Sequence, residues 1–114
     1  MKRSGEIAED MACDYLSGLG FEIIARNYKT KWYEIDIIAK RKKVLHFVEV
    51  KYRKTQEYGY AQEYVTPSKI RQLKFAAQAW VAAEGWDGYF VIDVIGITGE
   101  LHPKNLEFVQ NITS

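Results

Sequence analysis

Apolar residues at helical spacing predict two helices in this chain. The first is expected to begin at a Ser4 cap and to end before Gly20, and the second to begin at Thr66-Pro67 and to end at Gly85. One apolar face of each helix should be buried. The predicted buried residues are Ala8, Met11, Ala12, Tyr15, Leu16 and Leu19 in the first helix, and Ile70, Leu73, Ala77, Trp80 and Val81 in the second.

Runs rich in branched and aromatic residues predict strands between and after the helices. Residues 21–28 form the first run, and residues 34–54 contain two more runs joined by a short basic turn. Residues 89–97 form a further strand, and residues 106–109 form a short last strand. The polar, tyrosine-rich stretch from residue 52 to residue 65 has no clear period and predicts a loop.

The order of these elements predicts an α/β fold built on a mixed sheet of about five strands. The strands are apolar on both faces, so helices should cover both sides of the sheet. The first three strands are expected to form a meander, and the strand after the second helix is expected to run parallel to its neighbour. The length predicts one domain over residues 1–114.

The hairpin within residues 34–54 carries an unusual pair of acids. Asp36 and Glu49 each interrupt an apolar run, and Lys51 follows Glu49 by two residues on the same strand face. A symmetric turn at Arg41-Lys42 would place Asp36 opposite Phe47, with Glu49 as a diagonal neighbour on that face. Ionised acids within apolar strands are costly unless they are paired or bind a metal. The pair is therefore a candidate site, and a structural cluster bridged to Lys51 is the alternative.

Charge is concentrated beside these acids although the whole chain carries only +1. Residues 40–54 hold seven basic side chains and one acidic side chain, a net charge of +6. Residues 1–39 carry −2 and residues 55–114 carry −3. Such a basic segment is typical of a surface that contacts phosphates, and a solvated turn that protects a sheet edge explains it equally well. The basic residues are Lys40, Arg41, Lys42, Lys43, Lys51, Arg53 and Lys54.

Composition excludes several other classes of protein. The single cysteine, Cys13, excludes an internal disulfide framework and is expected to be a buried, inert thiol. No apolar run is long enough to span a membrane, and the N-terminus lacks the apolar core of a signal peptide. We therefore expect a soluble cytoplasmic protein.

Few chemistries other than a carboxylate site remain available. The sequence has no glycine-rich phosphate loop and no paired cysteines for zinc. His46 alternates away from Glu49 and is expected to be a packed or edge histidine rather than a ligand, and Asp93 is expected to be structural. Carboxylate oxygens without His or Cys suit a hard cation such as Mg²⁺ or Mn²⁺.

The spacing of Asp36 and Glu49-Val50-Lys51 resembles the active-site pattern of the PD-(D/E)xK nuclease superfamily. Across nearly the whole chain, the sequence resembles the YraN-like family of predicted bacterial endonucleases, which is similar to archaeal Holliday-junction resolvases. The matching residues are Gly5-Glu6, Gly20-Phe21, Arg26-Asn27-Tyr28, Glu34-Ile35-Asp36-Ile37-Ile38-Ala39, Phe47-Val48-Glu49-Val50-Lys51, Arg53, Gly59, Lys69 and Asp93-Val94.

This resemblance implies a restriction-endonuclease-like fold and a metal-dependent nuclease that cuts DNA, including branched DNA. It implies that Asp36, Glu49 and the Val50 carbonyl hold the metal, and that Lys51 orients or activates the attacking water. Glu6 would reach the site from the first helix, directly or through a water molecule. Arg53 and Lys69 would contact phosphates, as the charge pattern suggests for Lys42, Lys43 and Lys54. Related resolvases act as symmetric dimers, so a homodimer is expected.

A second function class stays open on the sequence alone. Relatives of this fold can be non-catalytic nucleic-acid-binding modules with a vestigial nuclease site. The dependence of activity on a divalent cation distinguishes the two classes, because a binding module keeps its affinity when a chelator is present.

Overall fold

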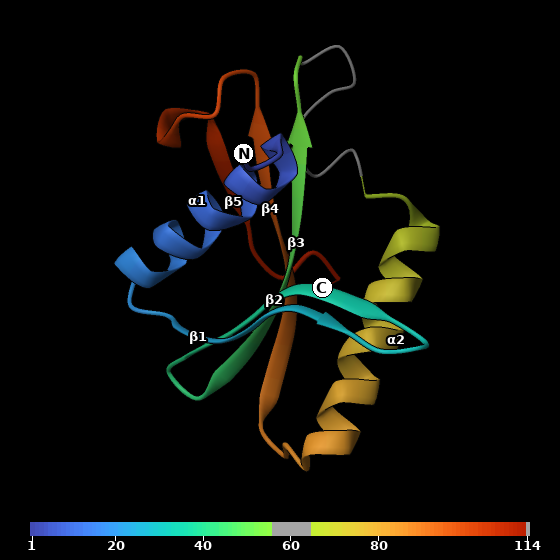
Figure 1. Ribbon diagram of the computed structural model, residues 1–114. Coiled ribbons are helices and arrows are strands. Elements are labelled where there is room, and N and C mark those ends of the chain that lie inside the picture. The colour runs from blue at the N-terminus through green and yellow to red at the C-terminus, as the bar shows by residue number, and fades with distance from the viewer. Residues whose placement is uncertain (56–64, 114) are drawn as a thin grey trace.

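A computed structural model describes residues 1–55 and 65–113 of the chain. The elements follow the order that the sequence predicts, and Figure 1 shows them around a single sheet. Their bounds are α1 Ser4–Gly18, β1 Glu22–Lys29, β2 Glu34–Arg41, β3 Val44–Arg53, α2 Pro67–Glu84, β4 Tyr89–Thr98, a 3₁₀ turn η3 at Pro103–Asn105, and β5 Leu106–Val109.

The sheet is mixed and has the strand order β1-β2-β3-β4-β5. Antiparallel pairing joins β1 to β2 and β2 to β3, which makes the predicted meander. Strand β4 runs parallel to β3 after the chain crosses through α2, and β5 returns antiparallel to β4. The predicted α/β fold is confirmed, and the arrangement is consistent with a restriction-endonuclease-like fold.

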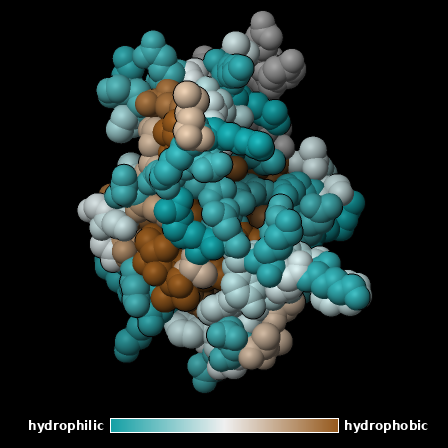
Figure 2. All heavy atoms as spheres, in the orientation of Figure 1, coloured by the Kyte–Doolittle hydropathy of each residue, from teal (hydrophilic) through white to brown (hydrophobic). Residues whose placement is uncertain are grey.

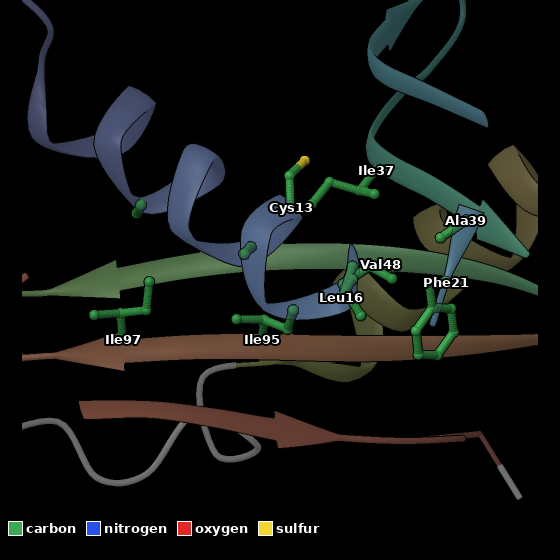
Figure 3. Close-up of a cluster of buried hydrophobic side chains, with 10 residues drawn as sticks. Cys13, Leu16, Phe21, Ile37, Ala39, Val48, Ile95 and Ile97 are labelled. Carbon is green, nitrogen blue, oxygen red and sulfur yellow. The ribbon is translucent and has the colours of Figure 1, made fainter. Parts of the chain in front are cut away.

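The two helices cover opposite faces of the sheet, as the apolar strands predict (Figure 1). On the α1 face, Leu16 lies near Val48 of β3 and Ile95 of β4, and Cys13 lies beside Ile37 of β2, as Figure 3 shows. On the α2 face, Trp80 packs edge-on against Phe47 at a centroid distance of 5.8 Å. Each face therefore has its own hydrophobic cluster, and the sheet separates the two.

The predicted helices are confirmed, but the N-cap residue predicted for the first helix is wrong. Ser4 lies inside α1, because the Ile7 amide donates to the Arg3 carbonyl and so makes Arg3 the cap residue. Thr66 caps α2 as expected, with its hydroxyl oxygen accepting from the Lys69 amide at 3.1 Å. Gly85 ends α2 in the left-handed conformation, at φ 70°.

Several predicted boundaries and buried positions also change. Tyr52 and Arg53 belong to β3 rather than to a loop, because the parallel ladder continues to the pair Arg53–Thr98. The rest of the predicted loop includes residues 56–64, which lie outside the described residues. Tyr15 and Leu19 of the predicted helical stripe are exposed instead of buried.

The surface is mostly hydrophilic on the face drawn in Figure 2, where apolar side chains gather near β1. Neither α1 nor α2, the two long helices of the described ranges, has the length and apolar character needed to cross a membrane.

Candidate functional site

The pairing of β2 with β3 brings the two predicted acids together. Ile37 pairs with Val48, so the next position of the antiparallel ladder sets Asp36 directly opposite Glu49. Both side chains line the same pocket, which confirms that they share a face of the hairpin. The predicted register is wrong, however, since Phe47 pairs with Ile38 and not with Asp36.

The register differs because the turn lies one residue later than predicted. Arg41 pairs with Val44, which leaves a two-residue turn formed by Lys42 and Lys43. Both turn residues have positive φ values, 53° and 66°, as a type I′ turn requires. Asn-Gly or Asp-Gly usually marks such a turn, and two lysines give no such signal. The shift moves each partner by two positions, so the acids stay on one face.

Four elements contribute to the pocket around the acids. Asp36 lies near the start of β2, and Glu49 and Lys51 lie in the second half of β3. The first turns of α1 and α2 close the sides. The lining residues are Gly5, Ala8, Glu9, Glu34, Asp36, Glu49, Val50, Lys51, Tyr52 and Lys69.

The two carboxyl groups differ in their affinity for protons. Burial, together with the hydrogen bond and the negative charge of Glu49, raises the pKa of Asp36 to about 8. Burial also disfavours the charged form of Glu49, but the hydrogen bond from Asp36 and the Lys69 ammonium outweigh it and lower the pKa of Glu49. At neutral pH the pair therefore holds one proton, on Asp36, and one negative charge, on Glu49.

Lys69 supplies the positive charge that this pair needs. Its Nζ lies 2.9 Å from Glu49 Oε2, and Glu49 is only 6% exposed. The contact is an ion pair by distance, yet among the described residues no hydrogen bond of good geometry reaches that oxygen. Lys69 was predicted to contact phosphates, and in the structure its ammonium contacts the acid.

Lys51 and Val50 approach the acids from β3. Lys51 lines the pocket, and its charge contributes to the lowered pKa of Glu49. The Val50 amide donates a hydrogen bond of 2.9 Å to Asp36 Oδ2, which ties the acid of β2 to the neighbouring strand. A metal-binding role for the Val50 carbonyl stays a prediction.

The acidic residue of α1 that lines the pocket is Glu9, whereas Glu6 is exposed and is absent from the lining. Glu6 was predicted from the resemblance alone. Helical spacing was a signal for Glu9, because this residue borders the buried stripe of Ala8 and Ala12 while Glu6 points further from it.

Four basic residues of the +6 segment that were predicted to bind DNA divide into two groups. Lys42 and Lys43 are exposed at the turn, six residues from Asp36 and therefore roughly 20 Å along the strand. Arg53 and Lys54 lie at the opposite end of β3, in a hollow that Tyr52 shares with the carboxylate pocket. Only the second group adjoins the acids.

Three other polar side chains have structural positions. His46 is buried and its Nδ1 lies 2.6 Å from Asp93 Oδ2, on the sheet face away from Glu49. Asp93 is fully buried, and its Oδ1 accepts from the Asn111 amide at 2.8 Å. Cys13 is buried, as expected, and burial raises the pKa of its thiol.

The carboxylate oxygens of the pocket fit a hard cation whose remaining ligands are water or substrate oxygens. Within residues 1–55 and 65–113, no three His, Cys, Asp or Glu side chains gather as a metal cluster. Asp36 and Glu49 are two carboxylates on one side of a polar pocket, and Mg²⁺ commonly uses one or two carboxylates, substrate phosphates and water. Burial and, to a smaller extent, the charge of Glu49 disfavour ionised Asp36 and raise its pKa, and such a cation would favour the ionised form.

Fold and pocket together define an α/β protein with a paired-carboxylate site on a mixed sheet, and comparisons with known proteins identify its family. The sequence profile of the Uncharacterised protein family UPF0102 matches residues 8–97, so the chain belongs to this family. This confirms the predicted YraN-like membership.

Individual relatives carry the same family name. A UPF0102 protein of Cytophaga hutchinsonii is 38% identical over 104 residues, which cover 91% of this chain and 92% of the relative. A relative from Geobacter sulfurreducens is 46% identical over 82% of this chain and 74% of its own length. A third, from Helicobacter pylori, is 36% identical over 98% and 92% of the two chains.

The raised pKa of Asp36 predicts how stability depends on pH. Between about pH 5 and pH 8 the folded protein keeps a proton on Asp36 that the unfolded chain has released, so rising pH destabilises the fold. Relative to Asp36→Asn, the free energy of unfolding of the wild type should fall across this range, by at most about 1.4 kcal/mol per pH unit. Urea denaturation of both proteins in chelator measures the difference, and parallel curves would contradict the assignment.

Proposed function

We propose that this protein is a metal-dependent endonuclease that hydrolyses DNA phosphodiester bonds, including those of branched DNA. The observation that carries the proposal is the juxtaposition of Asp36, Glu49 and Lys51 in one pocket, with the acids on adjacent strands. Two carboxylates can hold a divalent cation, and a lysine beside them can orient the attacking water and oppose the charge that develops on the phosphate. Membership in UPF0102 supports the assignment through the resemblance of that family to PD-(D/E)xK nucleases.

The chemistry assigns a distinct task to each side chain. Hydrolysis forms a bond from a water oxygen to phosphorus, breaks the bond from phosphorus to a sugar oxygen, and passes one proton to that leaving oxygen. Lys51 would orient the attacking water and oppose the negative charge that develops on the phosphate. Asp36 and Glu49, with the Val50 carbonyl, would hold Mg²⁺ or Mn²⁺. When bound, such an ion polarises the phosphate and makes water more acidic.

Cations around the pocket supply the proposed contact with DNA. Lys69 lines the pocket, and Arg53 and Lys54 flank its outer end along β3. All three could neutralise phosphates on either side of the cut. Lys42 and Lys43 would contact DNA only if the substrate extends along the hairpin to the distant turn. Cutting both strands of a branched substrate calls for two sites, which is the basis for proposing a homodimer.

A second candidate function is a DNA-binding module without catalysis. The ion pair between Lys69 and Glu49 favours it, because an ammonium group already neutralises the ionised acid. A protein that needs no metal could keep this arrangement permanently. Metal binding and cleavage therefore decide between the two functions.

Substitution of the three proposed catalytic residues should abolish cleavage. Asp36→Asn, Glu49→Gln and Lys51→Ala should each reduce the rate by roughly a hundredfold or more, and double variants should be little worse, because the residues act as a unit. Nicking of single-stranded, duplex, flap and four-way-junction DNA in Mg²⁺ or Mn²⁺ measures this. Glu22→Gln, an exposed carboxylate of β1, is the control and should retain full activity. Equal rates for all four variants would locate the chemistry elsewhere.

Divalent cations should stabilise the folded protein because they relieve the repulsion between Asp36 and Glu49. At a hundredfold excess over the dissociation constant, a bound ion raises the free energy of unfolding by about 2.7 kcal/mol. A thermal-shift titration with Mg²⁺ and Mn²⁺ measures this, and Glu49→Gln should lose most of the shift. If the wild type shows no shift and cuts no substrate, the binding-module function is correct.

The salt dependence of DNA affinity should distinguish the two basic groups. Lys54→Ala should reduce the log–log salt slope by about one, as expected for loss of one phosphate contact. Charge reversal of Lys42 and Lys43 tests the distant turn by the same anisotropy measurement. An unchanged slope there would show that the turn is only a solvated edge, and an unchanged slope for Lys54→Ala would remove β3 from the DNA interface.

A further inference from the structure

The turn between β1 and β2 presents an aromatic side chain to solvent on an ordered backbone. Thr30 organises this turn: its amide donates to the Tyr33 carbonyl at 2.8 Å. Its hydroxyl oxygen accepts from the amides of Trp32 and Tyr33, each at 3.1 Å. The indole of Trp32 nevertheless remains 75% exposed. The ring of Trp32 is therefore accessible to a ligand, and its significance depends on what lies beside it.

A second exposed ring faces the same space from α2. Phe75 is 55% exposed and meets Tyr33 edge-on at a centroid distance of 6.1 Å. Figure 1 shows the β1–β2 turn lying beside α2, and a cleft runs between them. We call this the aromatic cleft, and define it by Trp32, Tyr33, Phe75, Glu34, Lys69 and Arg71.

The aromatic cleft adjoins the carboxylate pocket. Glu34 and Lys69 line both hollows, so the cleft begins where the pocket ends. A polymer whose reacting group lies at Asp36 and Glu49 would therefore pass its neighbouring units over Tyr33, Phe75 and Trp32. The cleft is an extension of the candidate site and not a separate surface.

The charges of the cleft favour a polyanion. Arg71 and Lys69 line it, and the Lys31 ammonium lies 5.4 Å from the centre of the Trp32 ring. The acid of the cleft, Glu34, has its carboxylate 4.0 Å from the Lys29 ammonium. Exposed rings between cations are the combination that binds single-stranded nucleic acid, because rings stack on bases and cations contact the backbone.

We propose that the aromatic cleft stacks unpaired bases of a DNA strand whose phosphate occupies the carboxylate pocket. The substrate class is then DNA with a single-stranded segment beside the cut, such as a flap, a gap or a bubble. Bases in a continuous duplex are excluded, since neighbouring base pairs cover the faces that a protein ring would need. This inference rests on the proposed function and narrows its substrate.

Binding measured without catalysis tests the cleft separately from the nuclease. Fluorescence anisotropy in chelator compares a labelled oligothymidylate with a blunt duplex of equal length. Trp32→Ala and Phe75→Ala should each weaken single-strand binding roughly fivefold or more, and this loss should exceed the loss for duplex by a similar factor. Trp32→Phe, which keeps a ring, should retain most of the affinity.

A matched control is an exposed aromatic residue just beyond the C-terminal end of α2. Tyr89 is an aromatic residue that is 84% exposed, at the start of β4, and is absent from the cleft. Tyr89→Ala should leave both affinities unchanged. Because Trp32 and Tyr89 are exposed, neither substitution removes core packing.

The outcomes separate this inference from the proposed function. Absence of single-strand binding by the wild type, or equal losses on both ligands, would overturn the aromatic cleft as a base-binding site. Loss of self-association in Trp32→Ala with unchanged DNA binding would assign the cleft to a second copy of the chain and also overturn it. Single-strand binding that depends on Trp32 in a protein that cuts nothing would leave the cleft standing and remove the nuclease.

Discussion

The close approach of two carboxyl groups across β2 and β3 is the constraint on which the site depends. Two ionised acids at this separation, both largely removed from water, repel each other strongly. The raised pKa of Asp36 favours its neutral form at pH 7, and the Lys69 ammonium pairs with Glu49, so both relieve the repulsion. A divalent cation would be a third means, and it would compete with the other two. Protonation and ion pairing thus each lower the repulsion between the two acids, and metal binding would do the same.

The fold brings the required groups together from distant parts of the sequence. The hairpin sets the two acids opposite each other, and the parallel crossover through α2 returns the chain so that Lys69 reaches Glu49. Gly5 in the first turn of α1 and Lys69 in the first turn of α2 both line the pocket. Two helix N-termini therefore face it, and their dipoles favour negative charge there, whether on the acids or on a phosphate.

Much of this arrangement could be predicted from sequence because it follows from simple periodicities. The strand and helix patterns gave the order of elements, and alternation along β3 placed Glu49 and Lys51 on one face. The turn at Lys42 and Lys43 could not be located, because a type I′ turn built from two lysines lacks the usual glycine signal.

Contacts between distant elements were beyond sequence reasoning as well. The pairing of Lys69 with Glu49 depends on how α2 packs on the sheet, and spacing along the chain does not fix that distance. The choice between Glu6 and Glu9 depended on the rotation of α1 about its axis, which the buried stripe indicates only within a residue or two. The sequence left a packed or an edge position open for His46, and its partner Asp93 lies on a strand far along the chain.

The hydrogen bond from the Asn111 amide to Asp93 bears on how the chain can be shortened. Terminal residues usually tolerate removal when their backbone makes no buried contacts. Here the segment after β5 supplies a donor to a fully buried carboxylate, and the Ile112 amide also donates to the Ile92 carbonyl at 2.8 Å. Trimming the chain at Gln110 would deprive a buried acid of one donor, at a cost of about 1–3 kcal/mol. Removal of a few residues from this end would therefore disturb β4, which pairs with the strand that carries Glu49.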